Sequence, residues 1–310
     1  MAEWLWEPGI GETRAALIEH GTILKARVEL PGLRVGTVAR GRLRADRRVE
    51  LDGGGVVLLE RSPKGLSEGM ALTMRVTREA IPEPGRAKLA KAVPSESEPV
   101  RGPSLVDRIA ASGIPMRACR FVGPDLLEEA GWSEVLEEAR TGEIAFPGGM
   151  LRMSVTPAMT LFDVDGTTAP APLALAAAKA VAAAIVRQGI GGSIGIDFPT
   201  FAGKAERQAV ADAIDAALPR PFERTAVNGF GFLQIIRPRL RASLPELLAA
   251  DPVGAEARAA LRIMSRLSPP MTAPHIVSER VMRRIQSEPE WLRDLGHRLG
   301  GPISLVAQEQ

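Results

Sequence analysis

The spacing of hydrophobic residues changes part-way along this chain of 310 residues. In the first 92 residues the apolar positions form short runs separated by glycine and proline turns, and such runs are typical of β-strands. The predicted strands are residues 22–30, 35–38, 48–51, 56–59 and 71–76. Several short strands at close spacing predict a small β-barrel.

After residue 104, longer segments with helical periodicity alternate with apolar runs. The predicted helices are residues 105–111, 126–140, 172–188 and 205–218, and the predicted strands are residues 150–155, 159–164, 193–198 and 229–236. From residue 251 onward the pattern is mostly helical. An alternation of strands and helices predicts an α/β arrangement, in which functional residues gather at the carboxyl ends of the strands.

These patterns predict a mixed α+β protein that is divided linearly along the chain. We expect a β-rich domain at residues 1–92, an α/β domain at residues 105–250 and a helical C-terminal region at residues 251–310. Residues 93–104 are rich in proline, serine and glutamate, a composition typical of a linker.

Cysteine content and hydropathy narrow the class of protein. The one cysteine, Cys119, excludes an intrachain disulfide and a zinc site built from paired cysteines, and it fits a reducing compartment. The most apolar stretch, residues 173–186, is too short to span a bilayer and contains Lys179. We therefore expect a cytoplasmic protein without a membrane span.

The net charge is only +2, so the placement of charge matters more than its total. Residues 34–48 contain six arginines and one acidic residue, Asp46. A second cluster consists of Arg237, Arg239 and Arg241. Guanidinium groups at this density can bind successive phosphates of a nucleic acid, but they suit the solvated, charge-protected edge of a β-domain equally well.

Acidic residues stand at the ends of two predicted strands. Asp163 and Asp165 lie where the strand at residues 159–164 ends, and Asp197 lies at the end of the strand at residues 193–198. Residues two apart on a strand share a face, and neighbouring strand ends meet at one edge, so these carboxylates can converge on one cation such as Mg²⁺. An acid at the end of a buried strand is costly unless a metal or a base compensates it. The alternative is a simple turn at Asp165 with Asp163 as a cap.

Residues 163–167 also resemble the first motif of haloacid-dehalogenase-like phosphatases, Asp-x-Asp-Gly-Thr, in which the first aspartate is the nucleophile. That family completes its site with a Gly-Asp or Asp-Asp pair after a later strand, and no such pair follows Asp165 in this sequence. A phosphatase therefore stays the less favoured alternative.

Several segments together resemble the ribonuclease E/G family of bacterial endoribonucleases. Residues 146–151 (FPGGML) are similar to its LPSGGYL motif, residues 156–165 (TPAMTLFDVD) to TEALTAIDVN, residues 191–198 (GGSIGIDF) to GGIIVIDF, and residues 230–244 (FGFLQIIRPRLRASL) to LGLVEMTRKRxRxSL. Residues 12–17 and 35–42 resemble its opening strands and the entry to its S1 domain more loosely. The motifs recur in order with matching spacing, so the resemblance covers most of the chain and is most specific from residue 146 to residue 244.

The resemblance implies both a fold and a reaction. The fold is an N-terminal S1-like (OB) β-barrel with RNase H-like elements, followed by a DNase I-like α/β catalytic domain. The reaction is Mg²⁺-dependent hydrolysis of single-stranded RNA, with Mn²⁺ as an alternative metal. By position, Asp163 and Asp197 are the catalytic, metal-binding pair, and Asp165, where the family usually has asparagine, is a further metal ligand. The residues expected to grip RNA are Arg40, Arg42, Arg44, Lys204, Arg224, Arg237 and Arg239.

Two departures from the family bear on RNA binding and on assembly. Residues 30–80 contain no Phe, Trp, Tyr or His, whereas the family's S1 domain presents aromatic rings to bases, so RNA binding must depend on arginine and therefore on salt. Where the family has a paired-cysteine zinc clasp, residues 267–274 read LSPPMTAP, so we expect no zinc, and any homodimer is held by other contacts. The missing aromatics and Asp165 leave open a second hypothesis, a catalytically weakened RNA-binding protein.

Overall fold

The computed structural model describes residues 1–61, 65, 67–83, 87–121, 123–200, 203–267 and 274–308. The chain forms two compact units, each built from separate segments. Unit 1 comprises Met1–Gly32, Leu105–Trp132 and Leu248–Gln310, and unit 2 comprises Leu33–Ser104 and Ser133–Leu247. The units cut across the linear division expected from the sequence, because the first three strands pair with a strand at residues 116–118 and not with the barrel.

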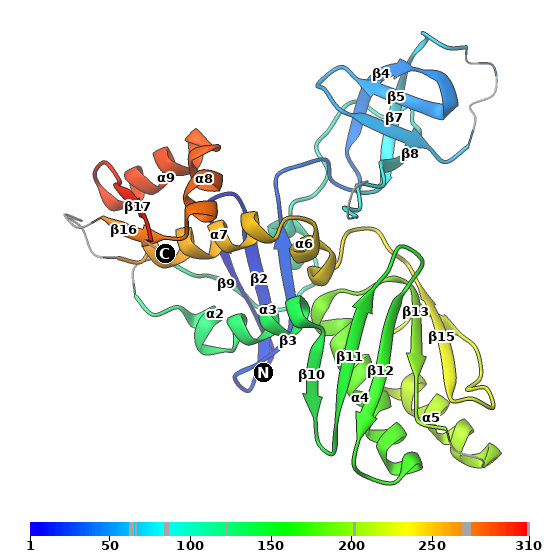
Figure 1. Cartoon of the computed structure of the whole chain (residues 1–310). Helices are drawn as coiled ribbons and strands as arrows, with labels where there is room; N and C mark the ends of the chain where they lie inside the picture. The colour runs from blue at the N-terminus through cyan, green and yellow to red at the C-terminus, as the bar shows by residue number, and fades with distance from the viewer. Residues whose placement is uncertain are drawn as a thin grey trace. The chain divides into compact units, whose positions relative to one another are not determined.

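Unit 1 is a four-stranded sheet with helices from the middle and from the C-terminal part of the chain. Its elements, labelled in Figure 1, are β1 (Glu3–Pro8), β2 (Thr13–Glu19), β3 (Thr22–Glu29), α1 (Leu105–Ala110), β9 (Met116–Ala118), α2 (Leu126–Glu129), α7 (Pro252–Met264), β16 (His275–Val277), α8 (Glu279–Gln286), α9 (Pro289–Leu299) and β17 (Leu305–Ala307). The sheet order is β3-β2-β1-β9, in which β1 and β9 are parallel. The segment that stands in place of the family's zinc clasp lies outside the described residues from 268 to 273.

Two apolar clusters hold unit 1 together. In the first, Trp4 and Leu17 of the sheet pack against Leu105 of α1. In the second, Ile10, from the turn between β1 and β2, is buried among apolar side chains of α7, α8 and α9. The neighbouring Gly11 has φ +72°, and a Cβ there would lie 2.6 Å from the ring of Trp291. The N-terminal turn therefore packs directly against the C-terminal helices.

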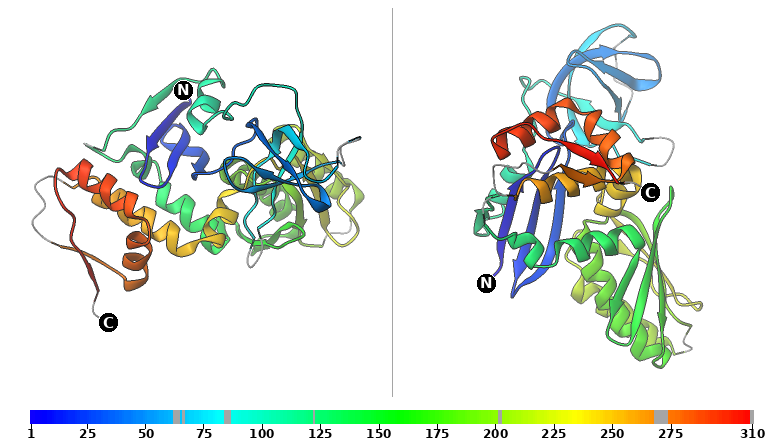
Figure 2. Two further views of the ribbon diagram at one scale, coloured as in Figure 1. Left: turned by 90° about the horizontal axis from the view of Figure 1, so that it is seen from above. Right: turned by 60° about the vertical axis from the view of Figure 1, so that its left-hand side comes forward.

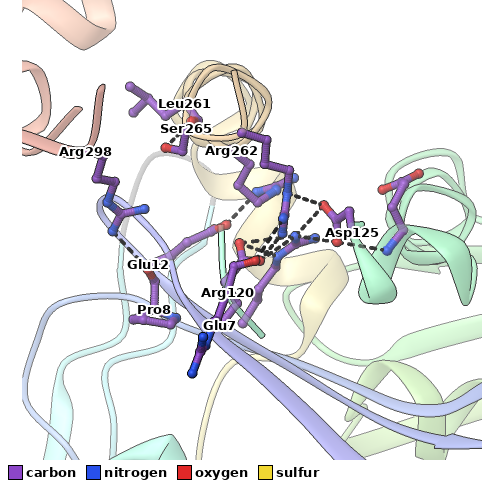
Figure 3. Close-up of polar contacts among 12 residues, drawn as sticks. Glu7, Pro8, Glu12, Arg120, Asp125, Leu261, Arg262, Ser265 and Arg298 are labelled. Carbon is purple, nitrogen blue, oxygen red and sulfur yellow. Dashed lines mark hydrogen bonds and ion pairs between the residues drawn. The ribbon is translucent and has the colours of Figure 1, made fainter. Parts of the chain in front are cut away.

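A buried network of charged side chains lies beside this turn (Figure 3). Glu7 and Arg14, both 0% exposed, pair at 3.2 Å between Oε1 and Nη2. Arg14 Nη2 also donates to the two carboxylate oxygens of Asp125, at 3.0 and 2.7 Å. Arg266, just beyond α7, pairs with Glu7 and reaches Asp125 with its Nε at 2.9 Å. Two acids and two arginines thus compensate one another inside unit 1.

Glu12, in the turn between β1 and β2, forms two further ion pairs. Its Oε1 lies 2.5 Å from Arg262 Nη1 and its Oε2 lies 3.2 Å from Arg258 Nε, and both arginines belong to α7. Figure 3 also shows the guanidinium of Arg298 donating to the carbonyl of Pro8, at 3.0 Å. Because Glu12 and Arg262 are 250 residues apart in the sequence, no local pattern could have indicated their pairing.

Unit 2 contains a closed barrel, which confirms the predicted small β-barrel in a mixed α+β protein. Its strands are β4 (Val38–Leu43), β5 (Arg48–Leu51), β6 (Val56–Leu59), β7 (Ala71–Arg78) and β8 (Ala90–Pro94), with a short 3-10 turn at Ala45–Arg47, and they close in the order β4-β5-β6-β8-β7. The alternate residues Val49, Val57, Leu59, Met74 and Val76 fill its interior.

Three details of this region differ from the sequence prediction. The strand predicted at residues 35–38 is wrong, because the chain turns at Gly36 (φ +88°) and β4 begins only at Val38. The strand predicted at residues 22–30 exists as β3 but belongs to unit 1. The expected linker, residues 93–104, takes part in the barrel, since β8 extends to Pro94 and Val100 pairs with Val38.

The second part of unit 2 is a six-stranded sheet with two helices on one face (Figure 2). Its elements are β10 (Glu143–Phe146), β11 (Gly149–Val155), β12 (Thr160–Gly166), α4 (Pro170–Gln188), β13 (Gly192–Asp197), α5 (Lys204–Ala217), β14 (Glu223–Arg224) and β15 (Phe232–Arg237). The strand order is β10-β11-β12-β13-β15-β14, and only β12 and β13 run parallel. Two further helices, α3 (Trp132–Thr141) and α6 (Leu244–Ala250), contain residues of both units.

Helix α4 is the parallel crossover between β12 and β13. The helix begins at Pro170, two residues before the predicted start, and it ends at Gln188 as predicted, where Gly189 with φ +70° takes the left-handed conformation. At 19 residues, with a mean hydropathy of 1.4 in its most apolar window, it is the one described helix long and apolar enough to cross a membrane. The helix is therefore longer than the apolar stretch at residues 173–186 that the sequence marked as too short to span a bilayer, and its side chains Leu173, Val181 and Ile185 lie in the core against the sheet.

The helix predicted at residues 126–140 is interrupted. Gly131 has φ +94°, which a continuous helix cannot contain, so the segment forms α2 and α3 with a break between them. The strand predicted at residues 229–236 begins later, at Phe232, because residues 228–231 form a turn.

Candidate functional site

Asp163 and Asp197 lie side by side at the carboxyl ends of the two parallel strands. The register of β12 and β13 pairs Asp163 directly with Asp197, so these strands are neighbours, which is the condition for the two carboxylates to converge. Partners on adjacent strands lie about 4.8 Å apart along the hydrogen-bonding direction, with their side chains on the same face. The local cause is the crossover helix α4, which returns the chain parallel to β12 and so brings both strand ends to one edge.

The face that carries the two aspartates is the one without α4 and α5. Along β12, Phe162 and Val164 are buried towards the helices, whereas Asp163 and Asp165 are exposed. Along β13, Ile194 and Ile196 are buried and Asp197 is exposed. The period of two along each strand therefore sends the core residues and the acids to opposite faces.

Asp163 and Asp197 belong to a row of side chains that runs across five strands. The register places Glu143 opposite Arg152, Arg152 opposite Asp163, Asp163 opposite Asp197, and Asp197 opposite Phe232. Because register partners project from the same face of a sheet, a cation and an aromatic ring flank the two carboxylates.

Asp165 pairs with Arg152 on the same face. Arg152 Nη1 lies 3.2 Å from Asp165 Oδ2, and the side chains are 65% and 51% exposed. An ion pair this exposed contributes little to stability, but it places a positive charge next to Asp163. Sequence reasoning missed Arg152, since its strand was predicted but the register that sets it opposite Asp163 is not visible in a single sequence.

The donor set suits a hard cation that retains water. Among the described residues, no three or more His, Cys, Asp and Glu side chains gather in a group that could hold a metal, so Asp165 does not join both Asp163 and Asp197 in such a group. Mg²⁺ is commonly held by one or two carboxylates, several waters and the phosphates of a substrate. The residues present, Asp163 and Asp197, fit that mode of binding.

Two helices begin just beyond the same edge. α4 follows β12, and α5 follows β13 with Lys204 as its exposed first residue. Helix N-termini carry partial positive charge, so this edge combines two carboxylates with cationic groups that attract a phosphate. Lys204 is the one member of the predicted RNA-gripping set that the fold brings to this end of the sheet.

The other predicted cations of the sheet region lie elsewhere. Arg224 of β14 is bound to Asp215 of α5 at 2.8 and 2.5 Å, which places it on the helix-covered face, and these bonds lower the pKa of Asp215. Arg237 is the register partner of Gly192, five residues along β13 from Asp197 and therefore about 17 Å away. Burial lowers the pKa of Arg237.

Arg239 is largely buried and forms an ion pair with Glu246. Its Nη2 donates to Glu246, a nearly buried carboxylate that also accepts from the backbone nitrogen and the hydroxyl of Ser243, each at 2.7 Å. Arg241, the third arginine of that cluster, pairs with Glu79 at 3.0 Å. The spacing by two in the sequence therefore does not produce one cationic stripe.

The barrel arginines are exposed on the outer side of β4. Arg40 and Arg42 alternate with the inward Gly41 and Leu43, and Arg44 continues the alternation just beyond the strand. Two of the three have acidic neighbours, since Arg40 lies 3.4 Å from Glu98 and Arg44 lies 2.5 Å from Glu50. Arg42 donates only weakly, to the carbonyl of Gly69 at 3.3 Å.

Comparison of the sequence with models of protein families finds no match, and comparison with curated proteins finds none either. The geometry of the acid pair is therefore the structural basis for inferring a function. That geometry offers two exposed carboxylates at the ends of adjacent strands, with Arg152 beside Asp163 and the uncharged Phe232 beside Asp197, on the face of the sheet that α4 and α5 do not cover.

Proposed function

We propose that this chain is a metal-dependent endoribonuclease that hydrolyses phosphodiester bonds in single-stranded RNA. The observation that carries the proposal is the direct register of Asp163 with Asp197 at the carboxyl ends of two parallel strands. The motifs that resemble the ribonuclease E/G family support it, because both aspartates fall at the positions of that family's catalytic pair.

Three residues of the row, Arg152, Asp163 and Asp197, have a role in the proposed reaction, and Lys204 at the start of α5 has another. Asp163 and Asp197 would hold Mg²⁺ or Mn²⁺, which would supply activation of a water molecule and stabilisation of negative charge on the phosphate. Arg152 offsets the negative charge of Asp165 and keeps the edge attractive to a phosphate. Lys204, the exposed first residue of α5, provides a further cation for the RNA backbone.

The barrel supplies the second element of the proposal. A closed five-stranded barrel is compatible with an S1-like (OB) fold, and the six-stranded sheet with its helices then corresponds to the DNase I-like catalytic domain. Arg40, Arg42 and Arg44 on the outer side of β4 bind phosphates through charge. The rest of the interaction must come from the sheet that carries the acids.

Substitution of the acid pair tests the proposed function. Asp163→Asn and Asp197→Asn should each reduce Mg²⁺-dependent cleavage of a 5′-labelled single-stranded RNA by about 100-fold or more, since a metal site supplies several kcal/mol of stabilisation to the transition state. Asp212→Asn, which removes an exposed carboxylate of α5, is the matched control and should cleave normally. Circular dichroism checks that each variant is folded.

Three outcomes discriminate between the candidate functions. If Asp163→Asn and Asp197→Asn both cleave RNA at the wild-type rate, the endoribonuclease assignment is refuted. RNA that is bound but not cut by the wild-type protein, in Mg²⁺ and in Mn²⁺, is the result expected of a catalytically weakened RNA-binding protein. Turnover of p-nitrophenyl phosphate would instead support the phosphatase alternative.

A further inference from the structure

Phe230 exposes its ring to solvent at the edge of the sheet that carries the acid pair. Its exposed fraction is 83%, and it is the only aromatic residue among the large exposed hydrophobic residues of the described chain. Burying a phenylalanine side chain stabilises the folded state by about 1.5–3 kcal/mol, and Phe230 does not contribute this free energy.

The turn that carries Phe230 is well defined by hydrogen bonds. The side-chain oxygen of Asn228 accepts from the backbone nitrogens of Phe230 and Phe232, at 2.9 and 3.0 Å. Gly231 has φ +93°, and a Cβ there would lie 2.3 Å from the carbonyl oxygen of Phe198, so the backbone needs glycine at this position. The exposed ring is therefore presented on a specified backbone.

The same turn lies against the segment that follows Asp197. Phe198 N donates to Gly231 O at 3.2 Å, and Thr200 Oγ1 donates to Phe230 O at 3.3 Å. Phe232 is the register partner of Asp197, and Phe230 is two residues before it. Two residues span at most about 7 Å and paired strands lie about 4.8 Å apart, so the Cα atom of Phe230 is within about 12 Å of that of Asp197.

We propose that the ring of Phe230 is a stacking platform for a nucleobase of the RNA whose phosphate lies at Asp163 and Asp197. The assignment rests on the proposed function for the class of its ligand. Stacking of bases on aromatic side chains is a principal source of affinity for single strands, and residues 30–80 of the barrel contain no aromatic residue to provide it. The aromatic contact is therefore located beside the acid pair and not on the barrel.

Binding without cleavage tests this role. The fluorescence anisotropy of a 5′-fluorescein single-stranded RNA is titrated with the whole protein in EDTA, so that binding is measured independently of catalysis. Phe230→Ala should weaken binding about tenfold, whereas Phe230→Trp should keep or improve the affinity. Ile263→Ala, which removes an exposed apolar side chain of α7, is the matched control and should bind normally.

A second titration separates contact with a base from contact with the backbone. It uses a single-stranded oligonucleotide that lacks bases at its central positions. Wild-type protein and Phe230→Ala should bind this abasic strand with equal affinity, and the slope of log affinity against log salt should be the same for both proteins, since the ring releases no counterions.

Two results would overturn the assignment. One is wild-type affinity of Phe230→Ala for the intact RNA, and the other is an equal loss on the abasic strand. Neither depends on cleavage, so failure of the stacking role is distinguishable from failure of the endoribonuclease assignment, which the Asp163→Asn and Asp197→Asn variants decide.

Discussion

Replacing Arg14 by leucine removes the central cation of the buried network in unit 1. Arg14 donates to Glu7 and to both oxygens of Asp125, and its guanidinium lies 5.3 Å from the ring centroid of Trp132. The network contains two carboxylates, Glu7 and Asp125, against the guanidiniums of Arg14 and Arg266. After the substitution, two negative charges face one positive charge, and one buried carboxylate is left uncompensated.

The expected loss of stability follows from that geometry. Removing one partner of a buried ion pair typically costs about 3–5 kcal/mol, because the remaining charge is desolvated without compensation. The matched control is Arg140→Leu, since Arg140 pairs with Glu137 at 2.5 Å but the two side chains are 65% and 58% exposed. That substitution should cost less than about 1 kcal/mol.

The chain offers a fluorescence signal that is confined to unit 1. All four tryptophans, Trp4, Trp6, Trp132 and Trp291, lie in that unit, and the chain has no tyrosine. Urea denaturation followed by tryptophan fluorescence should therefore report the unfolding of unit 1 alone. The midpoint should fall in Arg14→Leu with little change in the slope m, whereas Arg140→Leu should follow the wild-type curve.

The pH dependence provides an independent check. Burial raises the pKa of Glu7, and Arg14 and Arg266 oppose that rise, so loss of Arg14 should raise the pKa further. A carboxyl group with a raised pKa in the folded state favours folding below its ordinary pKa and loses that contribution as the pH rises through the folded value. The deficit of Arg14→Leu should therefore be larger at pH 8 than at pH 5.

Asp125 contributes in the opposite sense in the wild-type protein. Burial alone would raise its pKa, but the charge and hydrogen bonds of Arg14 and the contacts with Glu128 N and Arg266 together lower it. Its contribution is present above its ordinary pKa and is lost as the pH falls through the folded value, so wild-type unit 1 should lose stability in strong acid. A midpoint for Arg14→Leu equal to that of Arg140→Leu at every pH would refute this account of the network.

Two further predictions concern the charges expected to meet RNA. Arg42→Gln should lower the magnitude of the salt slope of RNA binding by about 0.7, the value for one phosphate contact on a single strand, because Arg42 has only a weak bond to Gly69; the slope is measured by anisotropy from low to moderate salt. Arg152→Gln should weaken RNA binding by leaving Asp165 uncompensated beside Asp163, and the double substitution with Asp165→Asn should restore it, as measured by the same titration.

The sequence predicted most of the elements around the acid pair because their signals are local. The apolar runs that became β12 and β13, and the alanine-rich segment that became α4, each carry their pattern within a few residues. Once a helix of this length joins two strands, a parallel neighbouring pair is the usual outcome, so the meeting of Asp163 with Asp197 was predictable as well.

The errors in the predicted site residues have one common cause. The face of the sheet from which a side chain projects, and the residue opposite it on the next strand, both depend on tertiary structure. Arg224 and Arg237 looked like surface cations, but the alternation along β14 and β15 sends both to the helix-covered face. Arg152 was overlooked for the same reason, since only the pairing of β11 with β12 reveals its neighbours. The assembly of unit 1 from both ends of the chain likewise depends on contacts between residues far apart in sequence, such as Glu12 and Arg262.

The structure also changes the reason for assigning a metal to the acid pair. An acid at the end of a buried strand is costly without a compensating cation, but Asp163 and Asp197 both lie on the exposed face, where water solvates them. What needs compensation is their juxtaposition, because like charges directly opposite one another on adjacent strands repel. Arg152 compensates only one side of the row, through Asp165 and Asp163. On the other side of Asp197 the partner is Phe232, which carries no charge, so the proposed metal ion is the group that would compensate Asp197.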